Sequence, residues 1–311
     1  MINVTQGDEE SIGLEIFFKS IFLLPSKSLK KINLFGNKAV IERHLKTLNI
    51  SYNIHKNKII FKKNIELNFT NISNQTNTSF ESFKAAVQQT KNESVLFTLP
   101  MSKKNFHDKN KQYKGHTDFF RKNFTNSSPK MFFLNGSEKL CLLTDHLPLD
   151  SVSRKINPEF FRNSLNDLIS IIDRYPSILE IKNILLSGIN PHAGEKGLIG
   201  NEEIELNKII NNIKLKTDII ISNLIPADTI HKKVTSLKET LLVFPYHDQG
   251  LCYFKPRNDI LGINLTLGLP FIRLSVDHGT ATNIWGKGIA NPTGCYYALL
   301  KALEFERNIH E

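Results

Sequence analysis

The sequence has few cysteines. Its 311 residues contain three, Cys141, Cys252 and Cys295, which are scattered and include no Cys-x-x-Cys pair. A disulfide-stabilised fold and a cysteine zinc site both require more cysteines at closer spacing. The sequence therefore indicates neither.

Long hydrophobic runs are also missing. No apolar stretch reaches the roughly 18 residues that a membrane-spanning helix needs, and Lys19 interrupts the run from Ile16 to Leu24. The first residues contain neither the basic segment nor the cleavage site of a secretory leader. We therefore expect a cytoplasmic protein that does not bind membranes.

Acidic residues are outnumbered by basic ones. The chain has 40 Lys and Arg against 30 Asp and Glu, a formal net charge of +10. A basic surface can bind nucleic acid, but the lysine-rich stretches 27–31, 56–63 and 103–114 contain no known nucleic-acid motif. We expect no nucleic-acid partner; a solvated surface or a phosphate-bearing substrate accounts for the charge.

No internal repeat is present, and predicted strands alternate with predicted helices. Apolar runs predict buried strands at 2–5, 32–35, 94–98, 131–134, 140–144, 184–186, 218–221, 241–244 and 270–276. Amphipathic segments predict helices near 11–20, 39–48, 80–90, 158–174, 201–213 and 294–308. Polar stretches predict loops at 64–78 and 103–115. The alternation predicts a two-lobed α/β fold with mixed, mostly parallel sheets and helices on both faces.

Three histidines follow three of these strands. His146 follows residues 140–144, His192 follows 184–186, and His247 follows 241–244. Strand ends of an open α/β sheet converge on a crevice where ligands bind. Imidazole suits zinc, cobalt, nickel or iron, and three protein ligands leave positions open for a substrate. A single histidine at a strand end is usually an ordinary hydrogen-bonded residue, but three in similar settings favour one catalytic metal site.

Six segments in this order resemble the 4-hydroxythreonine-4-phosphate dehydrogenase family, and the similarity spans most of the chain. They are Gly115-His-Thr-Asp, Thr144-Asp-His-Leu-Pro-Leu, Gly188-Ile-Asn-Pro-His-Ala-Gly-Glu, Pro226-Ala-Asp-Thr, Tyr246-His-Asp-Gln-Gly and Asn264-Leu-Thr-Leu-Gly-Leu-Pro-Phe-Ile-Arg-Leu-Ser-Val-Asp-His-Gly-Thr-Ala. An ordered set of this length is much more specific than a lone glycine motif.

The resemblance implies NAD-dependent oxidation of 4-phosphohydroxy-L-threonine, followed by decarboxylation to 3-amino-2-oxopropyl phosphate, in pyridoxine biosynthesis. It implies NAD or NADP, a divalent ion such as Zn, Mg or Co, and a homodimer with a shared active site. It also implies a fold of the isocitrate and isopropylmalate dehydrogenase type. One lobe would comprise residues 1–125 and about 270–311, and the other about 126–269 with most metal ligands.

The resemblance also implies the roles of individual residues. The metal ligands would be His146, His192 and His247, and the substrate would contact His116, Thr117, Lys255, Asn264 and Arg273. For the cofactor we expect the loop carrying Asp277, His278, Thr280 and Asn291. Asp248 is a candidate catalytic base or a residue that orients a metal ligand, and both roles remain open.

Two segments depart from the family pattern. After the first strand the family reads Thr-Pro-Gly-Asp-Pro-Ala-Gly-Ile-Gly-Pro-Glu, and this chain differs at Gln6, Glu9, Glu10, Ser11 and Leu14. Residues 196–200 read Lys-Gly-Leu-Ile-Gly where the family has Gly-Gly-His-Phe-Gly. A milder change is Asp118 in place of Glu. These changes put substrate closure and cofactor geometry in question, but all metal and substrate positions are retained, so we expect activity.

Three other functions are compatible with the sequence. A paralogous dehydrogenase of 4-phosphothreonate or 4-phosphoerythronate would use the same metal and cofactor. A metal-dependent hydrolase could use the same three histidines with a bound water. A non-catalytic metal- or nucleic-acid-binding protein would fit the basic charge.

Overall fold

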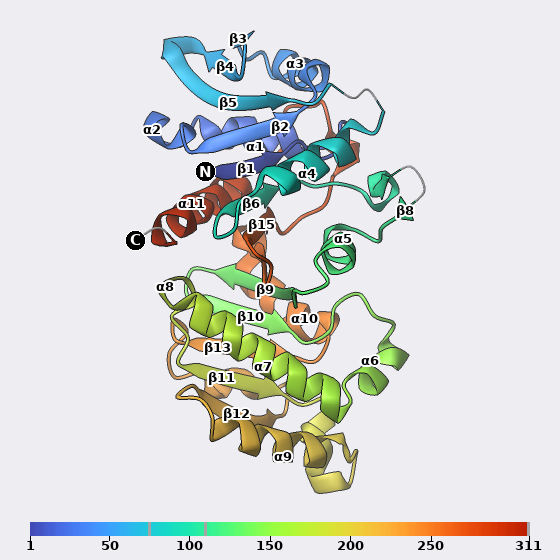
Figure 1. Cartoon of the computed structure of the whole chain (residues 1–311). Helices are drawn as coiled ribbons and strands as arrows, with labels where there is room; N and C mark the ends of the chain where they lie inside the picture. Colours follow the sequence, from blue (N-terminus) through green and yellow to red (C-terminus); the bar gives the residue numbers. More distant parts are fainter. Residues whose placement is uncertain (74–75, 109–110, 310–311) are drawn as a thin grey trace. The chain divides into compact units, whose positions relative to one another are not determined.

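The computed structural model describes residues 1–73, 76–108 and 111–309. The chain forms two compact units (Figure 1). Unit 1 comprises Met1–Pro129 and Ile263–Glu311, and unit 2 comprises Lys130–Gly262. Unit 1 is therefore built from both ends of the sequence, and unit 2 from one continuous segment.

The strands of unit 1 follow the order β14-β15-β6-β1-β2-β5-β4-β3. From β15 to β5 neighbouring strands are parallel, whereas β14, β4 and β3 each run antiparallel to a neighbour. The central strands are apolar throughout because both of their faces are buried. The bounds are β1 (Ile2–Thr5), β2 (Ile32–Gly36), β3 (Tyr52–His55), β4 (Lys58–Phe61), β5 (Ile65–Asn71), β6 (Val95–Thr98), β14 (Ile263–Leu267) and β15 (Ile272–Val276).

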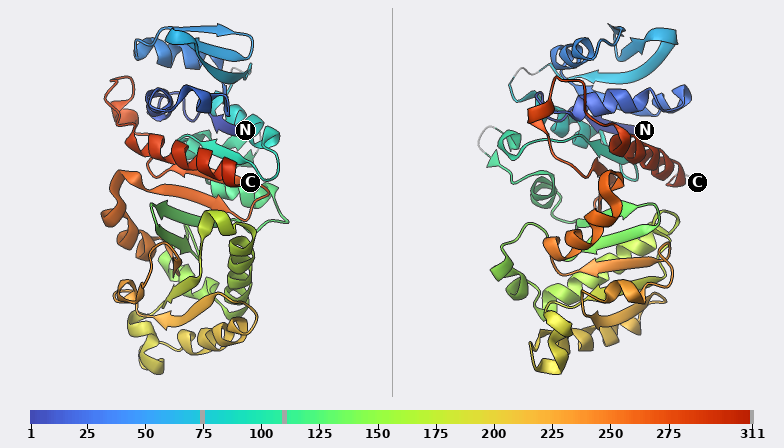
Figure 2. Two further views of the ribbon diagram at one scale, coloured as in Figure 1. Left: turned by 90° about the vertical axis from the view of Figure 1, so that its left-hand side faces the viewer. Right: turned by 180° about the vertical axis from the view of Figure 1, so that it is seen from behind.

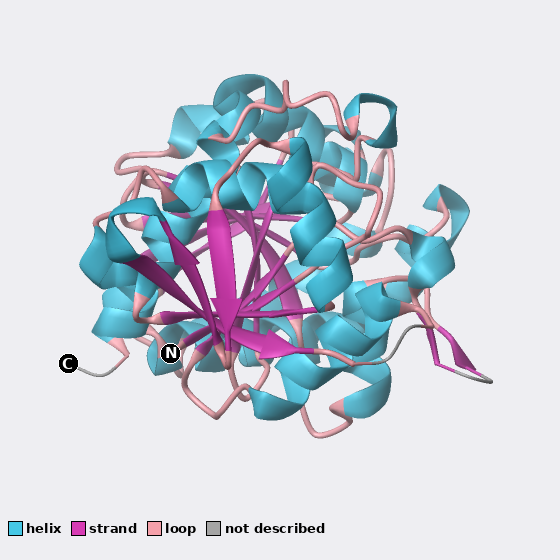
Figure 3. Cartoon of the chain, turned by 90° about the horizontal axis from the view of Figure 1, so that it is seen from above, coloured by secondary structure: helices cyan, strands magenta, loops and turns pink. Residues whose placement is uncertain are grey.

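Helices cover this sheet. The bounds are α1 (Gly13–Ile21), α2 (Ser26–Leu29), α3 (Lys38–Thr47), α4 (Thr78–Gln89), α5 (His116–Asn123) and α11 (Thr293–Asn308). Helix α4 packs on β1 and β2, α11 packs on β15 and β6, and α1 packs on α11. In Figure 3 the strands are coloured magenta and the helices cyan. A separate short pair, β7 (His107–Asp108) and β8 (Lys111–Gln112), precedes α5.

Unit 2 has the strand order β12-β11-β13-β10-β9. The first four are parallel and β9 is antiparallel to β10. The strands are β9 (Lys130–Asn135), β10 (Glu138–Leu142), β11 (Asn183–Ser187), β12 (Ile220–Ile225) and β13 (Thr240–Phe244). The helices are α6 (Leu149–Lys155), α7 (Pro158–Arg174), α8 (Pro176–Leu179), α9 (Glu202–Lys214) and α10 (His247–Asn258). Helix α9 packs on β12, and α10 packs on β10 and β13 (Figure 2).

Short turns complete the chain, and two of them, at 62–64 and 191–197, contain left-handed residues. Their bounds are Lys62–Asn64, Lys103–Asn105, Pro191–Gly197, Ile230–Lys233, Asp259–Leu261 and Thr282–Ile284. None of the helices in the described ranges is both long enough and apolar enough to cross a membrane.

The α/β class and the mostly parallel pairing are confirmed, but the loop predicted at 64–78 is wrong over much of its length. Strand β5 occupies Ile65–Asn71, and residues 74–75 lie outside the described part. Leu67 and Phe69 are buried while Glu66, Asn68 and Thr70 are only partly buried, the pattern of a half-buried strand. The predicted loop 103–115 also contains β7 and β8, and its residues 109–110 lie outside the described part.

Candidate active site

The three predicted metal ligands follow adjacent strands of unit 2. His146 follows β10, His192 follows β11, and His247 follows β13 as the first residue of α10. Strand β13 lies between β11 and β10, and all three are parallel. Their carboxyl ends therefore meet at one edge of the sheet, the edge that binds ligands in open α/β folds.

His146 and His247 lie close together at this edge. Their ring centroids are 5.4 Å apart, and both rings line a cavity of about 440 Å³ together with Asp145, Tyr246 and Asp248. His247 Nδ1 is 2.7 Å from Asp248 Oδ1. A carboxylate on one ring nitrogen fixes the imidazole and directs the other nitrogen to a ligand. Two imidazoles beside carboxylates suit a divalent ion of the zinc or cobalt type.

His192 is not assembled with this pair. It lies in Pro191–Gly197, where the residues from His192 to Gly197 all have positive φ angles. Within the described ranges, no group of three His, Cys, Asp or Glu side chains is arranged to hold a metal ion. The structure therefore brings two of the three predicted ligands together and places the third on the neighbouring loop.

Arg273 in β15 is the main charged group of the predicted substrate site, and it belongs to unit 1. Its side chain is 5% exposed. Nε donates to Thr98 Oγ1 (2.9 Å), and Nη1 donates to Asn264 Oδ1 (3.2 Å) and Thr266 Oγ1 (3.4 Å). Burial lowers the pKa of Arg273 to about 9, so it stays charged at neutral pH. Within the described residues no carboxylate pairs with this cation.

His116 begins α5 in an aromatic setting near Arg273. Its ring lies 5.0 Å from Phe83 and 4.5 Å from Phe106, centroid to centroid. In the described part of the chain its buried Nε2 has no hydrogen-bond partner. Burial, and then the charge of Arg273, lower the pKa of His116 well below its usual value. The imidazole is therefore neutral at neutral pH and can donate one hydrogen bond to an anion.

The remaining predicted substrate residues divide between the units. Thr117 follows His116 in the first turn of α5, and Asn264 lies in β14; both are half-buried in unit 1. Lys255 is exposed on α10 of unit 2. The sequence analysis did not identify Thr98 and Thr266, which accept hydrogen bonds from the guanidinium of Arg273. The one sequence signal for them is a polar residue within an apolar strand.

The predicted cofactor residues lie on the segment between β15 and α11 in unit 1. Thr280 O accepts the backbone N–H of Ile12 (3.0 Å). Asn291 Oδ1 accepts the backbone N–H of Thr293 (3.0 Å) at the start of α11. Asp277 is half-buried and His278 is exposed. The segment therefore presents polar groups at the surface of the unit while its two ends are fixed.

Residues 28–302 match the family model described as pyridoxal phosphate biosynthetic protein PdxA. The chain belongs to this family. It is 31% identical over 320 residues to the 4-hydroxythreonine-4-phosphate dehydrogenase of Sulfurihydrogenibium sp., covering 98% of each chain. The alignment with the Enterobacter sp. enzyme of the same name is 34% identical and spans 68% of this chain and 64% of the relative.

Other relatives and solved structures support the fold. A protein of Oceanobacillus iheyensis, provisionally named a D-threonate 4-phosphate dehydrogenase, is 30% identical over 98% of this chain and 97% of its own. The crystal structure of 4-hydroxythreonine-4-phosphate dehydrogenase from Klebsiella pneumoniae matches with a TM-score of 0.78 and 25% identity, covering 98% and 99%. Isocitrate dehydrogenase from Methylococcus capsulatus matches with a TM-score of 0.52 and 14% identity, covering 99% and 87%. The family resemblance, the dehydrogenase class and the isocitrate dehydrogenase-like fold are confirmed.

Proposed function

We propose that the protein oxidises the secondary alcohol of 4-phosphohydroxy-L-threonine with NAD or NADP, and that the resulting 3-oxo acid loses CO₂ to give 3-amino-2-oxopropyl phosphate. The observation that carries the proposal is Arg273, a buried cation with no carboxylate partner in the described chain, beside a neutral His116. A buried cation without a counter-charge is unfavourable. The guanidinium of Arg273 is therefore suited to bind the phosphate or carboxylate group of an anionic substrate.

The residues of each unit have separate tasks in this reaction. In unit 1, Arg273 supplies a fixed positive charge whose orientation Asn264 maintains, and His116 and Thr117 donate hydrogen bonds. In unit 2, Lys255 adds a second positive charge for the substrate. The two substrate groups that need these donors are the carboxylate and the phosphate.

His146, His192 and His247 would hold a divalent ion in unit 2. The dinucleotide would supply the hydride acceptor, and the ion would supply the positive charge that stabilises negative charge on the substrate oxygen. Asp248 holds the ring of His247 through the 2.7 Å contact, and we assign it this orienting role. The side chains of Asp277, His278, Thr280 and Asn291 would contact the dinucleotide.

We further propose a cytoplasmic homodimer with a shared active site. Leu149 is 70% exposed and Leu198 is 84% exposed, close in sequence to His146 and His192. A contiguous exposed apolar patch marks a surface that a partner covers, and we assign these two leucines to such a surface. Light scattering on the purified protein tests this, and a monomer at micromolar concentration would contradict it.

NADH formation with 4-phosphohydroxy-L-threonine tests the proposed activity. We expect turnover that a chelator abolishes and that added Zn²⁺, Mg²⁺ or Co²⁺ restores. The relative from Oceanobacillus iheyensis supports a second candidate, oxidation of D-threonate 4-phosphate. That compound and 4-phospho-D-erythronate therefore serve as competing substrates, and a preference for either would replace the first assignment.

A further inference from the structure

The segment between β15 and α11 is hydrogen-bonded near its start to Ile12, the residue before α1, and near its end to α1 itself. Near its start, Thr280 O accepts the backbone N–H of Ile12 (3.0 Å). Near its end, Lys19 Nζ donates to Gly288 O (2.8 Å) and Ala290 O (2.9 Å). These contacts join residues far apart in the sequence, so they fix the path of the segment.

Glu15, a buried residue of α1, also hydrogen-bonds to this segment. Its side chain is almost fully buried, and Oε1 accepts both the backbone N–H of Ala290 (2.8 Å) and Lys19 Nζ (2.8 Å). A carboxylate so far from water needs a paired charge and hydrogen bonds. Glu15, Lys19 and the backbone of residues 288–290 therefore form one network, in which removing either side chain leaves its partner uncompensated.

Lys19 has no donor left for a ligand. An ammonium group has three N–H donors, and Lys19 directs them to Glu15, Gly288 and Ala290. Direct binding of a phosphate by Lys19 would break this network. Lys19 therefore stabilises the backbone of this segment and is not itself a ligand-binding residue.

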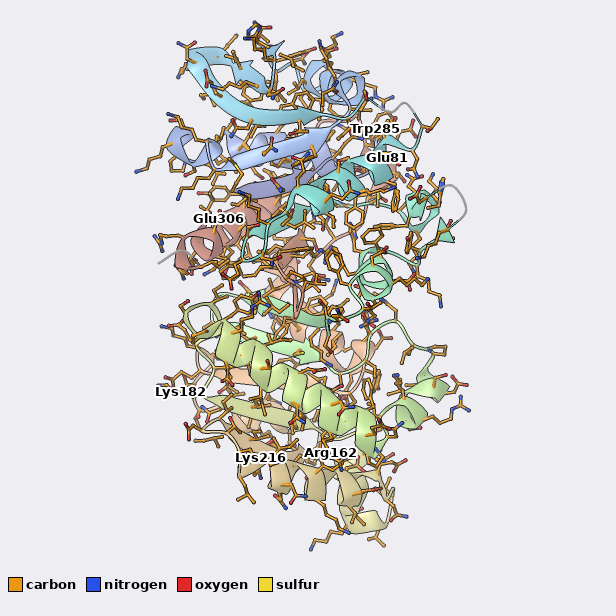
Figure 4. The ribbon with its side chains drawn as sticks, viewed as in Figure 1. Glu81, Arg162, Lys182, Lys216, Trp285 and Glu306 are labelled. Carbon is orange, nitrogen blue, oxygen red and sulfur yellow. The ribbon has the colours of Figure 1, made fainter. Side chains whose placement is uncertain are left out.

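Trp285 lies between the fastened ends and packs on α3. Its ring centroid is 5.7 Å from the Arg43 guanidinium and 6.2 Å from the His44 ring. Figure 4 labels Trp285 in unit 1. It is the sole tryptophan of the sequence and is half-buried. Its fluorescence therefore reports on this segment alone.

We propose that Glu15 and Lys19 are positioning residues for the dinucleotide, because they hold residues 288–290, next to Asn291, in the conformation that binds it. The inference rests on the proposed function, since it takes residues 277–291 to be the cofactor segment. A segment that occupies its binding conformation for a smaller fraction of time binds more weakly by that same fraction. Loosening the network should therefore weaken dinucleotide binding without changing the substrate site.

The test compares Lys19→Met and Glu15→Gln with the wild type by titrating NAD against Trp285 fluorescence. We expect the Kd for NAD to be roughly tenfold higher in the variants than in the wild type. Without NAD, Trp285 should emit at longer wavelength in the variants, because its ring is more exposed to water. The KM for NAD should rise with it, while the KM for the phosphorylated substrate and kcat at saturating NAD should change by less than about twofold. Lys19→Arg, which keeps charge and donors, should largely restore NAD binding.

Lys58→Met and Glu66→Gln are the matched controls, since they break an exposed Lys–Glu pair of the same unit. Wild-type NAD affinity with unshifted Trp285 emission in both test variants would overturn the inference. If the wild type itself binds no dinucleotide, the proposed function fails, and the Trp285 emission still decides whether the network holds the segment. If either variant does not fold, Lys19→Gln, which keeps two N–H donors but no charge, is measured instead against the same two outcomes.

Discussion

The positive charge of the Arg273 guanidinium disfavours protonation of the His116 imidazole. Burial first and this positive charge second lower the pKa of His116 well below its usual value. Burial alone lowers the pKa of Arg273 to about 9. At neutral pH the site therefore carries its charge on Arg273 and has a neutral hydrogen-bonding group beside it. An anion that binds there meets one cation and one neutral donor.

Replacing Arg273 by Met should weaken use of the phosphorylated substrate. A hydrogen bond to a charged group contributes about 1.5–3 kcal/mol, so kcat/KM should fall roughly 10–100-fold. Arg273→Lys keeps the charge but loses the planar fork of the guanidinium. Its kcat/KM should therefore lie between those of the wild type and Arg273→Met. Steady-state kinetics measure the effect, with Arg162→Met as an exposed control. An unchanged KM in Arg273→Met would show that the anion binds elsewhere.

Stability should fall as the pH drops below 6.5. The pKa values of His116 and His44 are both lowered in the fold, by burial first. The unfolded chain therefore binds more protons, and the contribution of the neutral rings, complete above 6.5, is lost as the pH falls through the lowered pKa values. Each histidine can add a slope of up to about 1.4 kcal/mol per pH unit.

Urea unfolding across this range measures that slope. His116→Asn and His44→Asn should each give a shallower slope than the wild type, because each removes one of the two groups. His231→Asn, at an exposed histidine, is the control and should leave the slope unchanged. Equal slopes in all four proteins would contradict the buried neutral state of His116 and His44.

Replacing His146, His192 or His247 by Ala should abolish turnover and leave the fold intact. His146 and His192 are exposed and His247 is half-buried, so none is a core residue. Metal affinity should fall by more than the roughly 10–100-fold lost when only a ligand's hydrogen-bonding partner is removed. Cobalt titration with circular dichroism measures both effects, and His231→Ala is the control. Full activity with unchanged metal stoichiometry would refute the metal assignment.

Glu203 should matter for metal binding although it contacts no ligand directly. Its Oε1 accepts the backbone N–H groups of Ile189 (2.9 Å) and Asn190 (2.8 Å), and its Oε2 accepts Asn190 Nδ2 (3.0 Å). This buried carboxylate holds the loop that carries His192. In Glu203→Gln the new amide NH₂ group would face N–H donors of this loop, from which it cannot accept a hydrogen bond. Cobalt binding should therefore weaken by about 10-fold or more. Glu205→Gln, at an exposed residue of the same helix, is the control and should not weaken it. Equal affinities in both variants would count against this role.

The parallel core could be predicted because its strands are buried on both faces and are therefore apolar without interruption. Helix α10 could not be predicted, since its sequence includes Gly250 and Pro256. It is held by Glu138 on β10, which accepts hydrogen bonds from Tyr253 (2.9 Å) and Asn258 (2.7 Å). Such contacts join distant parts of the chain and have no local pattern in the sequence.

The residues of the candidate site could be proposed from the sequence, but their arrangement in space could not. Each histidine follows an apolar strand, but the 5.4 Å between the rings of His146 and His247 depends on β10 pairing with β13. The left-handed backbone from His192 to Gly197 likewise depends on packing against α9. Strand order and loop conformation come from tertiary contacts, which periodicity does not encode.

The most direct test of the proposed activity is the stoichiometry of the complete reaction. The metal-loaded protein is incubated with NAD and 4-phosphohydroxy-L-threonine, and NADH, CO₂ and the organic product are measured together. We predict equal amounts of NADH and CO₂, with 3-amino-2-oxopropyl phosphate identified by mass. NADH formation without CO₂, or no turnover by a protein with metal bound, would contradict the assignment.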